Sequence, residues 1–210
     1  MTTNESKPRR GRPPKLDGEQ RETRDALLHT GMRLLTEQGF QSTGIDAVLR
    51  EVGVPKGSFY HYFPSKEAFG RAVLERYADY FNQKLDRCLL NETRAPLERL
   101  CDFVAEACEG MAKHDYRRGC LVGNLGQEVT VLPDGFREHL ETILCGWTAR
   151  LAACLRAAQH AGQLASQVDC DEMAAFFWIG WEGAVLRARL MRCDTPLQAF
   201  ARGFLALLPH

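Results

Sequence analysis

Residues 43 to 69 read TGIDAVLREVGVPKGSFYHYFPSKEAF, and this stretch decides the fold. Its first part has apolar residues at the i, i+3, i+4 and i+7 spacing of one helix face: Ile45, Val48, Leu49 and Val52. Ser42 or Thr43 is available to cap this helix, and Gly53 to end it. Pro55 suits the start of a second helix because the first turn has no use for the N–H that proline lacks. The stretch therefore predicts two short helices joined by a glycine-containing turn.

The second short helix has an unusual outward face. Once Phe59 and Phe63 are buried, the residues left facing outward are Lys56, Gly57, Ser58, Tyr60, His61 and Tyr62. An ordinary helical hairpin has a solvent face rich in Glu and Lys, whereas this face combines a cation with three aromatic rings and no acid. Two helices joined in this way place the second in the major groove of DNA. We predict a DNA-reading helix-turn-helix between Ile45 and Phe63, in which Gly57 lets the backbone approach phosphate.

Helical patterns continue on both sides of this stretch. A first helix runs from near Glu19 to Gln38 and ends at Gly39, and Ser65 caps another that reaches Cys88 or Leu90. We place five residues on the buried side of that helix: Phe69, Val73, Tyr77, Tyr80 and Phe81. Further helices are expected at 96–114, 121–130, 133–161, 170–192 and 196–208. No alternating strand pattern competes, so the expected fold is all-α with about nine helices.

Charge divides the chain although its net charge is zero. Residues 1–76 hold 13 Lys/Arg against 10 Asp/Glu, a balance of +3, while residues 77–210 hold 14 against 17, a balance of −3. A basic front part is the footprint of a module that neutralises phosphates. We therefore expect three parts: a disordered basic arm at 1–18, a DNA-binding domain at 19–76, and a second domain with another task at 77–210.

Composition also argues against several kinds of segment and site. No apolar run is long enough for a membrane span or a signal peptide, so we expect a cytoplasmic protein that joins the nucleoid when it binds DNA. All eight cysteines lie behind the basic front, and no pair has C-x-x-C spacing. We expect free thiols, no metal site and no cofactor.

The quoted stretch closely resembles the signature of the TetR family of repressors, and the resemblance covers about residues 22–76. It implies that Lys56, Ser58, Tyr60 and His61 meet bases or nearby phosphates. It also implies that Thr43, Tyr62 and Lys66 hold the sugar-phosphate backbone of double-stranded operator DNA. A further implication is a homodimer in which the last two helices of each chain form a four-helix bundle, so that two DNA-binding domains read one palindrome. Those apolar helix faces suit intrachain core equally well.

The arm contains Arg10-Gly11-Arg12-Pro13, which looks like the core of an AT-hook. In such a motif the arginines enter the narrow minor groove of A/T-rich DNA, so Arg10 and Arg12 join the predicted DNA contacts. The alternative is a basic tail that adds only non-specific attraction to phosphate.

Two segments stand out in the second domain, at 117–128 and 177–189. In the first, Cys120 stands at a predicted helix start next to Arg117 and Arg118, a setting that lowers the pKa of a thiol. The alternative is a buried cysteine that acts as a small apolar residue. In the second, helical spacing places four residues on one face: Trp178, Glu182, Val185 and Arg189. Such a face lines a pocket or, alternatively, a dimer interface.

Both segments resemble a TetR subgroup that responds to acrylate or to electrophiles, and the resemblance implies a small-molecule effector of that kind. Arginine stays protonated and holds a carboxylate in two hydrogen bonds, so we first expect reversible binding of a short unsaturated acid by Arg189. Trp178 and either Asn124 or Tyr116 would line that site, beside Glu182. Covalent modification of Cys120 is the second hypothesis.

Enzymes and purely structural proteins are the competing classes. The sequence has no glycine-rich phosphate loop, no H-E-x-x-H and no G-x-S-x-G, and its six histidines are scattered. We therefore predict that it is not an enzyme. A protein that only dimerises would leave the basic front and the acid-free aromatic face unexplained.

Overall fold

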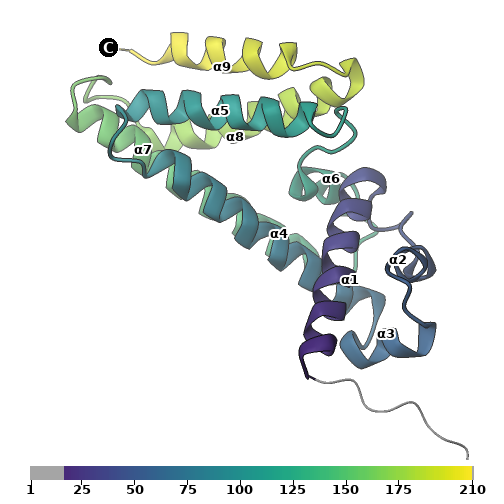
Figure 1. Ribbon diagram of the computed structural model, residues 1–210. Coiled ribbons are helices and arrows are strands. Elements are labelled where there is room, and N and C mark those ends of the chain that lie inside the picture. Colours follow the sequence, from purple (N-terminus) through teal and green to yellow (C-terminus); the bar gives the residue numbers. More distant parts are fainter. Residues whose placement is uncertain (1–16, 210) are drawn as a thin grey trace, which may run out of the picture.

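The computed structural model describes residues 17–209, and all regular structure in this range is helical (Figure 1). The helices are α1 (Asp17–Gln38), α2 (Ile45–Val52), α3 (Lys56–Tyr62), α4 (Lys66–Leu89), α5 (Pro96–Ala112), α6 (Leu121–Gln127), α7 (Phe136–His160), α8 (Cys170–Met191) and α9 (Thr195–Leu207). The prediction of an all-α fold with about nine helices is confirmed for the described range. None of these helices combines the length and the hydrophobicity needed to cross a bilayer.

The head of the molecule consists of α1, α2, α3 and the first turns of α4. Its core is aromatic: the ring of Phe59, which is fully buried, lies 5.6 Å from Phe63 and 5.5 Å from Phe69. Gly31 of α1 faces the Phe69 ring so closely that a Cβ there would lie 2.3 Å from it. Glycine at position 31 therefore makes room for the Phe69 ring between α1 and α4.

Helix ends in the head follow the predicted signals at four positions out of five, and Pro55 directly precedes α3. Ser65 caps α4 by accepting the N–H of Ala68 at 3.1 Å, and Gly53 ends α2 in the left-handed conformation at φ 72°. Gly39 follows α1 with φ 86°. The predicted cap of α2 was wrong, because Gly44 occupies the cap position and no side chain caps this helix.

The body is formed by α5, α7, α8, α9 and the second half of α4 (Figure 1). Its core is built on aromatic rings, and Trp147, Phe103 and Phe177 are among the most deeply buried side chains. Two predicted helix ends were too generous. The sixth helix stops at Gln127 rather than Thr130, and the seventh starts at Phe136 rather than Pro133, because Gly135 turns the chain at φ 78°.

Helix α4 runs without a break from the head into the body, so the boundary predicted at 76/77 falls inside one helix. Figure 1 shows the short α6 between the upper end of α1 and the helices of the body. Tyr80 was wrongly placed on the buried side of α4, since its side chain is 55% exposed. The head and the body are therefore connected by the continuous helix α4 and by the short helix α6.

Candidate functional site

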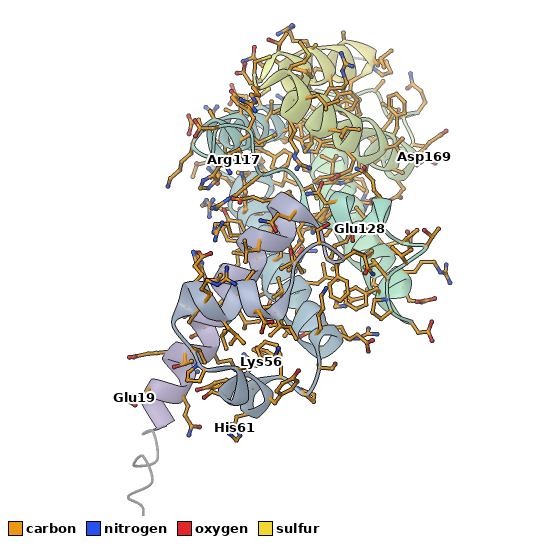
Figure 2. All side chains as sticks on the ribbon, turned by 90° about the vertical axis from the view of Figure 1, so that its right-hand side faces the viewer. Glu19, Lys56, His61, Arg117, Glu128 and Asp169 are labelled. Atoms are coloured by element: carbon orange, nitrogen blue, oxygen red, sulfur yellow. The ribbon has the colours of Figure 1, made fainter. Side chains whose placement is uncertain are left out.

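The outer face of α3 is the free tip of the head. Figure 2 shows Lys56 and His61 at the end of the molecule farthest from the body. Lys56, Gly57, Tyr60 and His61 are exposed, Ser58 and Tyr62 are partly buried, and Phe59 faces inward. The structure thus brings the predicted face together on one short helix.

Lys56 has a neighbour that its own helix does not supply. Its Nζ lies 3.0 Å from a carboxylate oxygen of Asp46 on α2, and this contact raises the pKa of Lys56. Both side chains are well exposed, so the pair holds the lysine in place without closing it off from water. A phosphate would have to compete with Asp46 for this ammonium group.

Gly57 has no internal reason to be glycine. A Cβ at this position would meet no atom within 4 Å, and the residue has no positive φ. Glycine in a helix costs stability relative to alanine, so its presence here points to a need outside the chain. A close approach of another molecule to the backbone is one such need.

Two of the predicted backbone clamps face inward. The side chain of Thr43 is 2% exposed and its hydroxyl donates to the carbonyl of Gly39 at 2.6 Å, so it does not reach out to phosphate as predicted. The ammonium of Lys66 lies 4.7 Å from the centre of the Phe40 ring and donates to the carbonyl of Gln41 at 3.3 Å. Burial lowers the pKa of Lys66. Arg10 and Arg12 lie outside the described residues.

A cavity of about 590 Å³ lies where the head meets the body. Four residues of α1 contribute to its wall, and the rest come from the body: His29, Met32, Arg33, Thr36, Tyr77, Tyr80, Phe81, Lys84, Phe103, Ala107, Gly110, Met111, Lys113, His114, Arg118, Gly119, Cys120, Trp181, Glu182 and Val185. Its size suits a small organic molecule. Because α1 belongs to the head, a molecule in this cavity would touch the DNA-reading part directly.

Lys84 is the buried cation of this wall, with 8% of its surface exposed. Its Nζ lies 3.8 Å from Glu106, which pairs more closely with Arg87. Burial lowers the pKa of Lys84, and Glu106 offsets this only in part. A buried lysine that shares its partner is short of negative charge, which a ligand can supply.

Cys120 and Glu182 lie together at another part of the wall, as predicted for the cavity, but the thiol has the opposite character. Burial raises the pKa of Cys120 well above its ordinary value, and the charge of Glu182 raises it further. The predicted low-pKa thiol is therefore wrong. Burial also raises the pKa of Glu182, to about 7.

Asn124 and Arg189 are near the cavity but do not line it. Arg189 donates to the side-chain oxygen of Asn124 at 2.7 Å, and Asn124 in turn donates to the carbonyl of Thr36 at 2.6 Å. These contacts connect α8 through α6 to the end of α1. Arg189 thus has one donor engaged within the chain, and it does not line the cavity.

Trp178 and Tyr116 are also displaced from their predicted positions. Trp178 is packed in the aromatic core, 5.2 Å from Trp147 between ring centres, and Trp181 lines the cavity in its place. Tyr116 sits in a turn with φ 56° and borders a separate surface hollow beside Arg117 and Arg192.

At the end of α6, Glu128 holds the loop that follows α1 by two hydrogen bonds, a contact that we call the grip. Glu128 accepts the backbone N–H of Phe40 at 3.0 Å and that of Gln41 at 2.9 Å. Gly39 leaves room for this carboxylate, since a Cβ there would lie 1.8 Å from Glu128 Oε1. Figure 2 shows Glu128 beside the upper end of α1. One short helix therefore begins at the cavity, next to Cys120, and ends on the head.

Lys84 and Glu128 were not predicted as site residues, and Arg118 was predicted to act on a different partner. A signal existed for Lys84, because it lies seven residues after Tyr77 and three after Phe81 on the apolar face of α4. Arg118 was assigned to Cys120 but pairs with Glu37 of α1 at 2.9 Å. Glu128 lies 88 positions from Phe40 and 87 from Gln41, so no local sequence pattern predicts these hydrogen bonds.

The chain belongs to the TetR family of bacterial regulators. Residues 27–73 match the family model described as bacterial regulatory proteins, tetR family, and residues 96–204 match the tetracyclin repressor-like C-terminal domain. It is therefore a helix-turn-helix transcriptional regulator that binds DNA.

Individual relatives extend the likeness over nearly the whole chain. Transcriptional regulator AcuR of Cereibacter sphaeroides is 49% identical over 198 residues, 94% of this chain and 90% of that protein. The repressor NemR of Escherichia coli is 33% identical over 177 residues, 84% of this chain and 89% of that protein. A crystal structure of regulatory protein TetR from Rhodobacter sphaeroides is 48% identical, covers 89% of this chain and 99% of its own, and has a TM-score of 0.87.

Proposed function

We propose that the protein is a repressor that binds a palindromic operator as a homodimer and is released by a small carboxylate such as acrylate. The observation that carries the proposal is the cavity wall, which α1 of the head shares with helices of the body. A ligand there changes contacts of the head itself. The sequence resemblance to acrylate-responsive regulators supports the choice of ligand.

Lys84 supports a carboxylate as the ligand class. Its ammonium group lines the cavity, is almost excluded from solvent and is poorly compensated by Glu106. A carboxylate placed beside it would gain a charge-assisted hydrogen bond in a setting of low dielectric. We therefore assign to Lys84 the anchoring role first expected of Arg189.

The proposed anchor is tested by releasing the protein from a labelled duplex, taken from upstream of its own gene, with increasing sodium acrylate. Lys84→Met should bind the duplex as the wild type does but need roughly tenfold or more acrylate for release, because a charge-assisted contact is lost. Lys113→Met is the matched control, since Lys113 lines the same cavity at an exposed position. An unchanged response of Lys84→Met, measured by fluorescence anisotropy, would remove Lys84 as the anchor.

Covalent modification of Cys120 is the second candidate, favoured by the position of this thiol on the cavity wall beside Glu182. The thiol would transfer its proton to Glu182, add to the β-carbon of acrylate, and the proton would return to the α-carbon. The raised pKa of Cys120 disfavours this route. Retained release in Cys120→Ser, with no gain of mass in the wild type, would exclude it.

A further inference from the structure

Glu182 has a carboxyl group for which the chain provides space but little compensation. Its Oε1 is buried and has no hydrogen-bond partner among the described residues. The other oxygen lies over α6, where a Cβ on Gly123 would be only 1.9 Å from Oε2. Glycine at 123 is therefore what allows this carboxyl group to sit in the wall of the cavity.

Two uncharged groups interact with Glu182. Cys120 faces it from the start of α6, and Tyr77 of α4 interacts with both that thiol and Glu182. Burial raises the pKa of Glu182, and hydrogen bonding to Cys120 lowers it less, so the result is about 7. The other titratable or charged groups of the cavity wall are His29, Arg33, Tyr80, Lys84, Lys113, His114 and Arg118.

A carboxylate effector would share this cavity with Glu182. Two negative charges about 8 Å apart at an effective dielectric of about 20 repel each other enough to weaken binding roughly thirtyfold. The repulsion disappears when Glu182 holds a proton. A proton on Glu182 also gives the cavity a hydrogen-bond donor where it now has an unpaired acceptor.

We infer that effector binding is proton-coupled: the cavity takes up a carboxylate together with a proton that stays on Glu182. This inference rests on the proposed function and names how the same site is regulated. The effector then binds most tightly at a pH below the pKa that Glu182 has in the free protein, and its affinity falls as the pH rises through about 7. A weak organic acid would thus release the operator more readily in an acidified cell.

The test is isothermal titration of the full-length protein with sodium acrylate between pH 6 and 9, in two buffers of different ionisation enthalpy. For the wild type we expect the Kd to rise by up to tenfold between pH 7 and pH 8, with uptake of up to one proton per site. Glu182→Gln keeps the shape of the side chain but cannot titrate. Its Kd should be nearly independent of pH and its proton uptake close to zero.

His29 and His114 also line the cavity, and a protonated imidazole attracts an anion, so His29→Gln and His114→Gln are the matched controls. Both should keep the pH dependence of the wild type. If Glu182→Gln does not fold, the two histidine variants decide, because in both of them acrylate should still bring a proton with it and the neutral probe acrylamide should not.

The results separate the two levels of the proposal. Heat of acrylate binding without proton uptake in the wild type would overturn the coupling and leave the effector assignment standing. A pH dependence that persists in Glu182→Gln, or disappears in a histidine variant, would overturn the role of Glu182. Absence of acrylate binding at every pH would overturn the proposed effector and the coupling with it.

Discussion

Gly57 is the residue at which we expect the requirements of folding and of DNA binding to diverge. Alanine has space there and is the better helix former, so Gly57→Ala should leave the stability of the head unchanged or raise it by about 0.5–1 kcal/mol. The same methyl group would stand between the α3 backbone and the DNA. We therefore expect weaker operator binding with an unchanged or higher melting temperature.

Gly146 supplies the control for this substitution. It lies within α7, where a Cβ would make only ordinary contact with Arg150 at 3.5 Å. Gly146→Ala should change the melting temperature in the same sense and leave the operator Kd as it was. Equal operator affinity for Gly57→Ala and the wild type, by anisotropy titration at one salt concentration, would contradict the prediction.

At single residues, the sequence predicted chemistry on helix faces better than it predicted partners. Glu182 lines the cavity as expected because helical spacing places it on that face of α8, and Cys120 lines it from the start of α6. Arg189 was chosen for its charge, but it donates a hydrogen bond to the neutral Asn124, a residue 65 positions away. The spacing of a helix places a side chain on a face, whereas its partner depends on which other helix packs there.

Among the elements, α6 links the cavity wall at Cys120 to the head, and Glu128 makes the contact with the head. Glu128→Gln leaves one acceptor for the two N–H groups of Phe40 and Gln41 and turns a donor toward the other. We expect a loss of about 1–2 kcal/mol in stability and faster hydrogen exchange at both amides.

Thermal unfolding and exchange measured by mass spectrometry test this grip, with Glu75→Gln as the control. Glu75 is exposed on α4, in neither the cavity wall nor the grip, so its substitution should leave both readouts unchanged. Identical exchange at residues 40 and 41 in Glu128→Gln and the wild type would show that the contact is dispensable.

Most elements could be predicted because each carries its own signal. Apolar patterns and end signals predicted all nine helices found in residues 17–209, and Gly53 and Ser65 marked ends that the structure reproduces. The errors occur where an end depends on a distant part of the chain. Thr43 would make a good cap in isolation, but its hydroxyl is used by Gly39 in the turn before it.

At the scale of the whole molecule, α4 and α6 both connect the head to the body, and both border the cavity. The cavity touches α4 at Tyr77 and Lys84, and α6 at its start. Under the proposed function, a ligand that moves these walls would tilt the head rather than a single loop. With two heads on one operator, a small tilt would change their spacing and lower the affinity for DNA.

Such spacing requires a dimer, and the last two helices offer a face for one. Large apolar side chains on them are exposed in the single chain: Phe176 45%, Ile179 76%, Leu186 40%, Leu190 68%, Met191 49% and Leu207 61%. Ile179→Glu places a charge in the middle of α8 on this face. We expect a monomer by sedimentation velocity at micromolar concentration, and loss of operator binding at least tenfold. Val131→Glu, at a side chain 58% exposed outside α8 and α9, should stay dimeric. If Ile179→Glu sediments and binds the operator as the wild type does, another face holds the two chains together. A ligand in the cavity would then have to change the spacing of the two heads through that other face.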